Sequence, residues 1–302
     1  MRVEYVRDGL VEEFHDGICV GLNDNDTEPY FLRSCAKPLQ ASLIIDCDID
    51  FTDEELALCC GSHAGEECHV RVANGILNKL GLDESYLKCG IHEPLAGLKE
   101  GETATAIHNN CSGKHLGFLA VCKAQGWDLD TYYEPEHPLQ VAVKKRIYEL
   151  CEINAFHASP LVGEAGRSPD EGGYPMTTDG CGVPIVSMPL HNLVKGFKNL
   201  NQQYPQLVNA ILKNPYIYGG INRLDTEIIQ KTGMLAKVGA GGLCVVLDTK
   251  LNDGFAVKMY DASMNARRIA VLDKLGVEYD NKIRTLSGKI VGEIRVLEKT
   301  ML

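Results

Sequence analysis

Long apolar segments are absent from this sequence of 302 residues. The longest apolar runs, such as Leu243 to Leu247, fall far short of the ~20 residues that a helix needs to cross a bilayer. The first residues, Met1 to Tyr5, include charged side chains and lack the apolar core of a signal peptide. These absences predict a soluble protein of the cytoplasm that has no membrane partner.

Basic residues are in the minority. The 30 lysines and arginines face 41 acidic residues, which leaves a formal net charge of −11, and no basic run or aromatic-interleaved basic stripe occurs. Since nucleic-acid-binding proteins usually carry such a feature, no nucleic-acid partner is expected. The contents of apolar residues (45%) and charged residues (24%) are close to the globular average, which excludes a disordered or coiled-coil chain.

Twelve cysteines are present, but none of them form a C-x-x-C pair. Without a secretory signal, a disulfide scaffold is not favoured, and most of the thiols are predicted to be small buried apolar side chains. Cys111 and Cys181 differ because they lie in polar, turn-forming segments. Two such thiolates would attract a soft divalent metal such as zinc, with His115 or Asp179 to complete the coordination. On spacing alone, two free buried thiols are the favoured interpretation.

Predicted strands lie near both ends of the chain and predicted helices lie between them. The segment from Thr52 to Glu55 has the pattern of a capping box that opens a helix. Because strands and helices do not alternate, we predict an α+β fold, an antiparallel sheet flanked by helices, rather than a doubly wound sheet. Residues 1–302 are expected to form a single catalytic unit, with a sheet from both termini and a helical insertion at about 50–230. The expected strands cover residues 3–6, 17–22, 30–33, 234–238, 243–247, 255–260 and 289–297.

Ser34 and Lys37 form the first pair of candidate catalytic residues. At positions i and i+3 of a predicted helix that follows a strand, their side chains share one face. A serine hydroxyl needs a base to become a nucleophile, and a lysine can be that base when burial or a second lysine lowers its pKa. The alternative is an ordinary serine N-cap beside a solvated lysine.

Ser62 and Lys237 are weaker candidates when each is considered alone. Ser62 is surrounded by small residues, which suit the close approach of backbone to a ligand, but an ordinary turn between helices has the same composition. Lys237 precedes the glycine-rich segment Gly239 to Gly242, which is typical of a backbone beside a substrate and equally of a tight hairpin.

Several segments together resemble the rhizobial-type (structural class 3) L-asparaginases, an asparaginase II family. They occur in the order of that family between about residues 31 and 245, so the joint match is far more specific than any one motif. The segments are Arg33 to Ala41, Gly61-Ser62-His63, Cys89 to His92, Asn110 to His115, Glu136-His137-Pro138, Thr178 to Cys181 and Ala236 to Gly239.

The resemblance implies a fold similar to serine β-lactamases and glutaminases, and two serine–lysine pairs in one active site. Ser34 with Lys37 matches the first pair, and Ser62 with Lys237 matches the second; we favour Ser34 as the nucleophile. The resemblance also implies a homodimer, and it maps further residues onto the site. The zinc ligands would be Cys111, Lys114 and Cys181. The substrate site would be lined by Arg33, His115 and Asp179.

The implied function is hydrolysis of L-asparagine to L-aspartate and ammonia by a serine that a lysine activates. A glutaminase or another small-amide hydrolase on the same scaffold remains an alternative, because one methylene changes binding by only ~1–3 kcal/mol. A zinc-binding thiol protein without catalysis is another. A β-lactamase is disfavoured, because Ser263-Met264-Asn265 follows Lys231-Thr232-Gly233 instead of preceding it.

Overall fold

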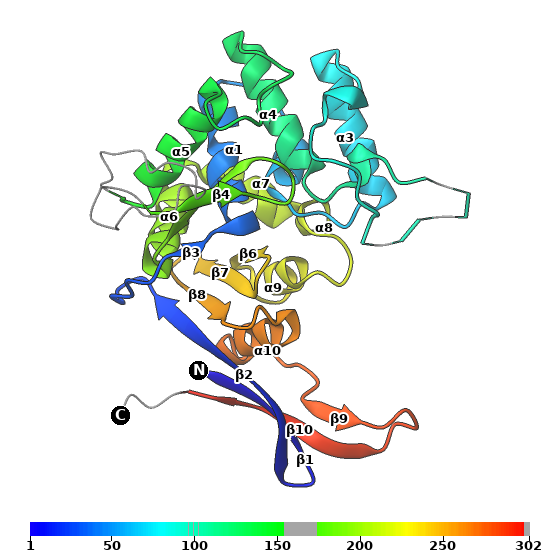
Figure 1. The fold of residues 1–302 in the computed structure, drawn as a ribbon, viewed down its shortest axis with the longest axis vertical. Coiled ribbons are helices and arrows are strands. Elements are labelled where there is room, and N and C mark those ends of the chain that lie inside the picture. Colours follow the sequence, from blue (N-terminus) through cyan, green and yellow to red (C-terminus); the bar gives the residue numbers. More distant parts are fainter. Residues whose placement is uncertain (96, 99, 102, 154–173, 299–302) are drawn as a thin grey trace.

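A seven-stranded antiparallel sheet extends from the middle of the molecule to one end (Figure 1). The computed structural model describes residues 1–153, except 96, 99 and 102, and residues 174–298. The strand order is β6-β7-β8-β2-β1-β10-β9, and β1 and β10 pair so that Arg2 lies opposite Leu297. The first and last described strands are therefore neighbours. The strands are β1 (Arg2–Arg7), β2 (Leu10–Gly21), β6 (Leu235–Gly239), β7 (Leu243–Asp248), β8 (Asp253–Met259), β9 (Lys282–Arg284) and β10 (Ile290–Leu297).

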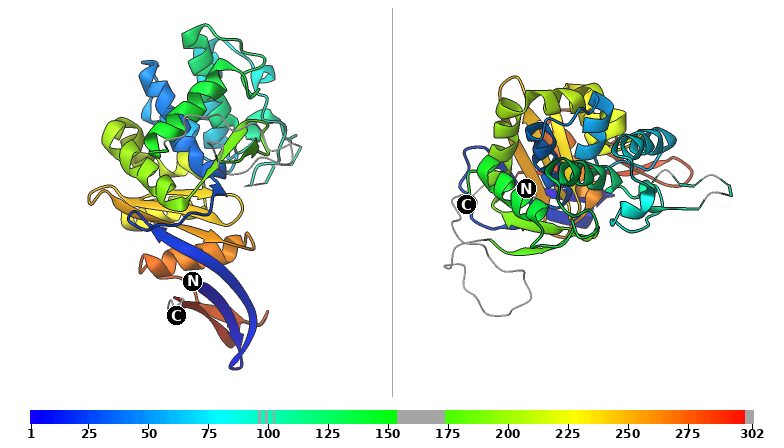
Figure 2. Two further views of the ribbon diagram at one scale, coloured as in Figure 1. Left: turned by 60° about the vertical axis from the view of Figure 1, so that its left-hand side comes forward. Right: turned by 90° about the horizontal axis from the view of Figure 1, so that it is seen from above.

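Helices cover one end of the molecule, and the other end is a sheet extension. Figure 1 shows most helices gathered above β6, β7 and β8, whereas β1, β2, β9 and β10 project away from them. Figure 2 shows that β2 curves along this extension. The helices are α1 (Lys37–Asp46), α2 (Asp53–Cys60), α3 (Glu67–Leu80), α4 (Ser112–Gln125), α5 (Pro138–Leu150), α6 (Leu190–Gln203), α7 (Pro205–Lys213), α8 (Pro215–Tyr218), α9 (Leu224–Thr232) and α10 (Met264–Lys274).

Short elements connect the sheet to the helices. A 3-10 helix, η1 (Arg33–Ala36), leads directly into α1, and two others are η2 (Glu84–Tyr86) and η3 (Ala106–His108). A second sheet has the order β3-β5-β4, with β3 (Tyr30–Phe31), β5 (Pro184–Met188) and β4 (Met176–Thr178). Since β3 immediately precedes η1, this small sheet brings the β4–β5 turn close to the start of α1.

Alternation along the strands sends side chains into two separate cores. In β7, Leu243, Val245 and Leu247 pack in the core of the helical part, whereas Cys244 and Val246 pack in a second core with α10. Successive strand residues point to opposite faces, which explains the split. In β6 the same alternation places Lys237 on the face of Leu235, toward the helices, while Ala236 and Val238 face the second core.

The expectation of an antiparallel sheet built from both ends of the chain, with helices packed on it, is confirmed. So is the capping box, in which Thr52 Oγ1 accepts the Glu55 N–H and the Glu55 carboxylate accepts the Thr52 N–H. The strand expected over 30–33 is wrong beyond Phe31, because the chain turns there into η1. The likeness of the fold to serine β-lactamases stays a prediction. So does the assignment of residues 1–302 to a single catalytic unit. No helix in the described ranges is long and apolar enough to cross a membrane.

Gly113 lets α4 pack directly on α2, which leads to a stability prediction. A Cβ at Gly113 would lie 2.2 Å from the Leu58 carbonyl oxygen, whereas one at Gly75 on α3 would meet nothing within 4 Å. Gly113→Ala should therefore lower the free energy of unfolding by about 1–3 kcal/mol, and Gly75→Ala should raise it by about 0.5–1 kcal/mol. Urea denaturation measures both, and equal effects of the two substitutions would contradict this packing.

Candidate active site

The residues singled out from the sequence come from five parts of the fold. Ser34 and Lys37 lie on η1 and at the start of α1, and Ser62 lies in the turn between α2 and α3. A sulfur-containing group is made of Cys111 and Lys114 at the start of α4 and Cys181 in the β4–β5 turn. Lys237 comes from β6. The helix starts and the strand end meet because η1 packs against both β6 and α1.

Lys37 is buried and its amine is held by three oxygen atoms. Its Nζ lies 2.8 Å from the Gly61 carbonyl oxygen, 3.0 Å from the Asn110 carbonyl oxygen and 3.0 Å from Ser62 Oγ. Burial lowers the pKa of Lys37, and repulsion from Lys114 and Lys237 lowers it further. A neutral amine has two N–H groups, which the two carbonyls accept, and one lone pair, which then faces Ser62 Oγ. This is the geometry of a base beside a hydroxyl.

Ser34 is half-buried, and its side chain makes no hydrogen bond to any described residue. The pairing of Ser34 with Lys37 is thus not seen as a hydrogen bond, because the buried amine of Lys37 is taken by the carbonyls beside Ser62. Ser34 follows Arg33, whose φ of 48° lies in the left-handed region that side chains rarely adopt. Such backbone strain is common at functional sites and makes the turn from β3 into α1 abrupt.

Lys237 is fully buried but is not bonded to Ser62. Its Nζ donates to Asp225 Oδ2 at 3.1 Å and to the Val238 carbonyl oxygen at 2.8 Å. Burial alone would raise the pKa of Asp225, but Lys237 and Arg223 together hold that pKa below its ordinary value. The expected pairing of Ser62 with Lys237 is therefore replaced by a buried ion pair. Asp225 was missed in the sequence, where its position near the start of a short helix is the only signal.

The side chains of Cys111, Lys114 and Cys181 lie close together in the structure. Lys114 Nζ lies 2.8 Å from Cys181 Sγ, and the thiols of Cys111 and Cys181 are hydrogen-bonded to each other. That hydrogen bond, with the nearby Lys37 and Lys114 ammonium groups, lowers the pKa of Cys111. Burial opposes the charge on Lys114, but the two sulfur atoms raise its pKa overall. The Lys114 ammonium thus favours the deprotonated form of Cys111, whereas the hydrogen bond to Cys111 and burial raise the pKa of Cys181.

Two sulfurs and one amine in contact fit a soft divalent cation once their protons are released. The fourth ligand expected from His115 or Asp179 does not come into place. Neither residue forms, among the described residues, a group with the two cysteines in which all ligand atoms lie within 4.8 Å. Asp179 instead pairs with Arg33, and His115 Nδ1 lies 2.6 Å from Tyr132 Oη.

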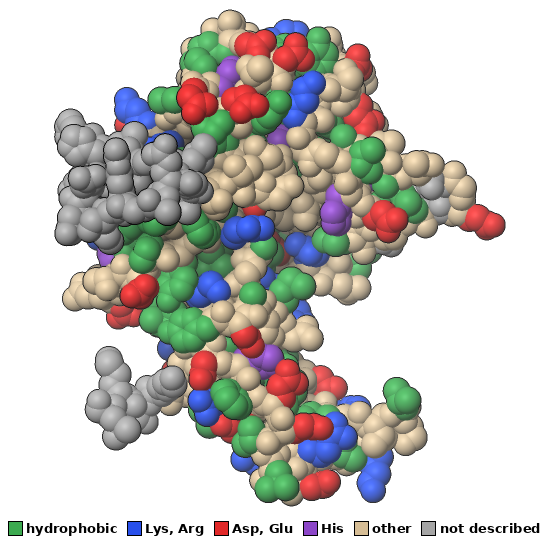
Figure 3. All heavy atoms as spheres, viewed as in Figure 1, with side chains coloured by type: hydrophobic (Ala, Val, Ile, Leu, Met, Phe, Trp, Pro, Cys, Tyr) green, Lys and Arg blue, Asp and Glu red, His purple; other side chains and the backbone are tan. Residues whose placement is uncertain are grey.

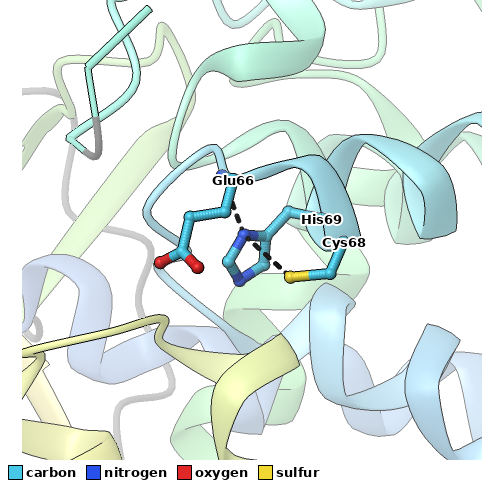
Figure 4. Close-up of side chains that lie close together, drawn as sticks. All are labelled: Glu66, Cys68 and His69. Carbon is cyan, nitrogen blue, oxygen red and sulfur yellow. Dashed lines mark hydrogen bonds between the residues drawn. The ribbon is translucent and has the colours of Figure 1, made fainter.

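Within the described part of the chain, Glu66, Cys68 and His69 form the one compact set of three histidine, cysteine or carboxylate ligands, drawn in Figure 4. His69 Nδ1 accepts the Glu66 N–H at 2.9 Å, and His69 Nε2 lies 2.8 Å from the Tyr216 carbonyl oxygen. Both ring nitrogens are therefore used to begin α3 and to hold α8. This set is structural, and no metal is assigned to it.

Arg33 and Asp179 pair at the edge of the site. The distance from Arg33 Nη2 to Asp179 Oδ1 is 3.1 Å, and the Arg33 side chain is 37% exposed against 11% for Asp179. Basic side chains also gather across the middle of the face in Figure 3, between the helical part and the sheet extension. His115 is fully buried, and its Nε2 has no hydrogen-bond partner among the described residues.

Comparison with known protein families identifies the chain. A family model described as L-asparaginase II matches residues 3–299, which is nearly the whole length. A search of curated proteins gave no match. The family model implies a hydrolase of the asparaginase type, which acts on the amide bond of a small molecule. The chain belongs to the L-asparaginase II family.

Proposed function

We propose that this protein is an L-asparaginase that converts L-asparagine and water into L-aspartate and ammonia, with Lys37 as the general base. The contacts of Lys37 carry the proposal. Its amine is buried, its pKa is lowered, and its lone pair faces a serine hydroxyl in a chain of this family. A lysine in water would be protonated at neutral pH and could not accept a proton.

Ser34 is the proposed nucleophile and Ser62 the proposed proton relay. Ser34 is half-buried at the start of α1, whereas Ser62 is only 3% exposed and is bonded to Lys37. A nucleophile must reach the substrate carbon, which favours the more accessible serine. Catalytic hydrogen bonds missing from a ligand-free site often form only with substrate, and the proposal requires the Ser34 hydroxyl to join this network when substrate binds.

The proton balance follows from these contacts. Ser34 Oγ attacks the side-chain amide carbon of asparagine, and the Ser34 proton passes by way of Ser62 to Lys37. Lys37 returns that proton to the leaving nitrogen, which departs as ammonia and leaves an ester on Ser34. Water then attacks the ester and gives one proton to Lys37, which returns it by way of Ser62 to Ser34 Oγ as aspartate is released.

Arg33 and Asp179 are the proposed partners of the substrate's charged groups. A zwitterionic amino acid has a carboxylate and an ammonium that match these two side chains in charge. The buried Nε of Arg33 has no hydrogen-bond partner among the described residues, so a carboxylate would satisfy it. His115, whose Nε2 is likewise unpaired, is proposed to line the same site.

Zinc is proposed to be held by Cys111, Lys114 and Cys181. When bound, it would supply a positive charge that orients the substrate, and it is not proposed to generate the nucleophile. Two thiolates and an amine are not the usual ligands of hydrolytic zinc, which favours such a positioning role. A homodimer completes the proposal. Apolar side chains on the sheet extension are exposed and available for such a contact, including Leu10, Phe14 and Leu286.

Ser34→Ala and Lys37→Met should each lower kcat for L-asparagine by about 10³-fold or more, since each removes a reacting group. Ser62→Ala should lower kcat less. Ser42→Ala is the matched control, because Ser42 is a buried serine on α1 that bonds only within its helix and to Arg146. Ammonia release from asparagine and glutamine measures all variants.

The serine variants also separate the alternatives. If activity is lost with Ser62→Ala and retained with Ser34→Ala, the roles of the two serines are exchanged. Faster turnover of glutamine than of asparagine would make the protein a glutaminase. If the folded wild-type protein releases no ammonia from either amide, the proposed function is wrong.

Cys111→Ser and Cys181→Ser should each weaken zinc binding by about tenfold or more, because each removes a ligand. Binding should also weaken as the pH falls, since the ligands must lose protons. Cys122→Ser provides the control, because Cys122 is a buried thiol of α4 without a role in this group. Zinc content after dialysis measures the effect. Wild-type protein that retains no zinc would refute this site.

A molar mass near twice 33.1 kDa is expected in solution. Burial of exposed apolar area drives such association, so it should persist at high salt. Light scattering coupled to size exclusion, at two salt concentrations, measures the mass. A monomer at every protein concentration would refute the homodimer.

A further inference from the structure

The Lys237–Asp225 ion pair lies in the interior, where neither side chain has any exposed surface. Lys237 Nζ donates to Asp225 Oδ2 and to the Val238 carbonyl oxygen, and it lies 5.5 Å from the centre of the Tyr218 ring. Asp225 Oδ2 also accepts the Val238 N–H at 3.2 Å. The Asp225 carboxylate thus bonds both to the side chain of Lys237 and to the backbone of Val238.

We propose that Asp225 is a positioning residue that keeps Lys237 charged and bonded to α9 instead of to Ser62, so that Lys237 acts as a fixed positive charge and not as a second base. This proposal rests on the proposed role of Lys37 as the base. It also gives different functions to two lysines that the family resemblance places in equivalent serine–lysine pairs.

Burial makes the charge of Lys237 depend on Asp225. An ammonium group without water is stable only beside an opposite charge or several acceptors. Among the described residues the sole anionic partner is Asp225, and the amine also contacts a carbonyl and an aromatic ring. An amide in place of the carboxylate would keep the shape but remove the charge, so the buried amine would release its proton.

The surroundings offer no substitute anion within the described residues. The other titratable or charged groups near the pair are buried thiols, a tyrosine and two arginines, and none of them would take over as counter-ion. They are Cys35, Cys60, Cys244, Tyr218, Arg223 and Arg267.

The charge of Lys237 acts on Lys37. Lys37 is also influenced by the charges of Lys114, Cys111 and Cys181, and His63 lies nearby. A positive Lys237 disfavours a second positive charge at Lys37 and thus favours the free base. If Lys237 loses its proton, Lys37 holds its own proton more tightly, and more alkaline conditions are needed to form the base.

The first experiment measures the stability of Asp225→Asn against pH and does not require activity. A lysine in the unfolded chain keeps its proton up to about pH 10.4, whereas Lys237 in this folded variant would be neutral. The unfolded state then binds more protons, so stability rises with pH. Between pH 6 and 9.5, the unfolding equilibrium constant should fall by up to about tenfold per pH unit relative to Asp225→Asn with Lys237→Met.

The double variant is the reference because it removes both charges, so it should fold and should lack this slope. Thr226→Val is the matched control for helix packing: Thr226 is the next residue on α9, is buried and loses one hydrogen bond to Pro215. Its loss of stability should be the same at every pH. If the difference in stability between Asp225→Asn and the double variant does not change with pH, Lys237 keeps its charge without Asp225, and the proposal is overturned.

The second experiment follows kcat/KM for asparagine against pH. In Asp225→Asn and in the double variant, the acid limb should move by about one pH unit to higher pH, because Lys37 must lose its proton without help from Lys237. Thr226→Val should leave the limb in place. A limb that stays or moves to lower pH in Asp225→Asn would mean that Lys237 is still charged, and it would overturn the proposal.

The two proposals fail in different ways. Wild-type protein without amidase activity refutes the proposed function, while the pH dependence of stability still decides whether Asp225 keeps Lys237 charged. An active wild-type enzyme with a flat stability difference leaves the function standing and refutes the role of Asp225.

Discussion

Burial of three lysine side chains around one site is the constraint on which the rest of the structure depends. Lys37, Lys114 and Lys237 are each exposed by 3% or less. An ammonium without water is strongly destabilised, so each amine must either lose its proton or gain an anionic partner. The surrounding elements provide three different environments for the three amines. As a result, the pKa of Lys37 is lowered and that of Lys114 is raised, although the side chains are chemically identical.

Each environment belongs to a particular meeting of elements. Carbonyl oxygens at the end of α2 and before α4 surround Lys37, where a neutral amine is favoured. Sulfur atoms from Cys111, just before α4, and from Cys181 in the β4–β5 turn lie around Lys114. A carboxylate from α9 meets Lys237 on β6. The close packing of α4 on α2 at Gly113 and the two-sided burial of β7 hold these elements at their separations.

Local patterns in the sequence were sufficient for much of the fold. The capping box at Thr52 and the apolar runs of β7 and β8 depend on neighbours within a few residues, so they could be predicted. The change from strand to 3-10 helix at Arg33, the short helices α7 and α8, and the small sheet were not predicted. They depend on packing against distant segments, such as the pairing of Tyr30 with Met188, which no local pattern encodes.

The residue types of the candidate site and their order were determined by the sequence alone, because the motifs around Ser34, Ser62, Cys111 and Cys181 are local. Tertiary structure decided which groups are partners: Lys37 with Ser62, Lys237 with Asp225, and Lys114 with Cys181. The reason is physical. Spacing along a helix or strand fixes only the direction of a side chain, whereas the partner of a buried charge depends on which acceptors from distant segments remain unpaired in the same dry interior.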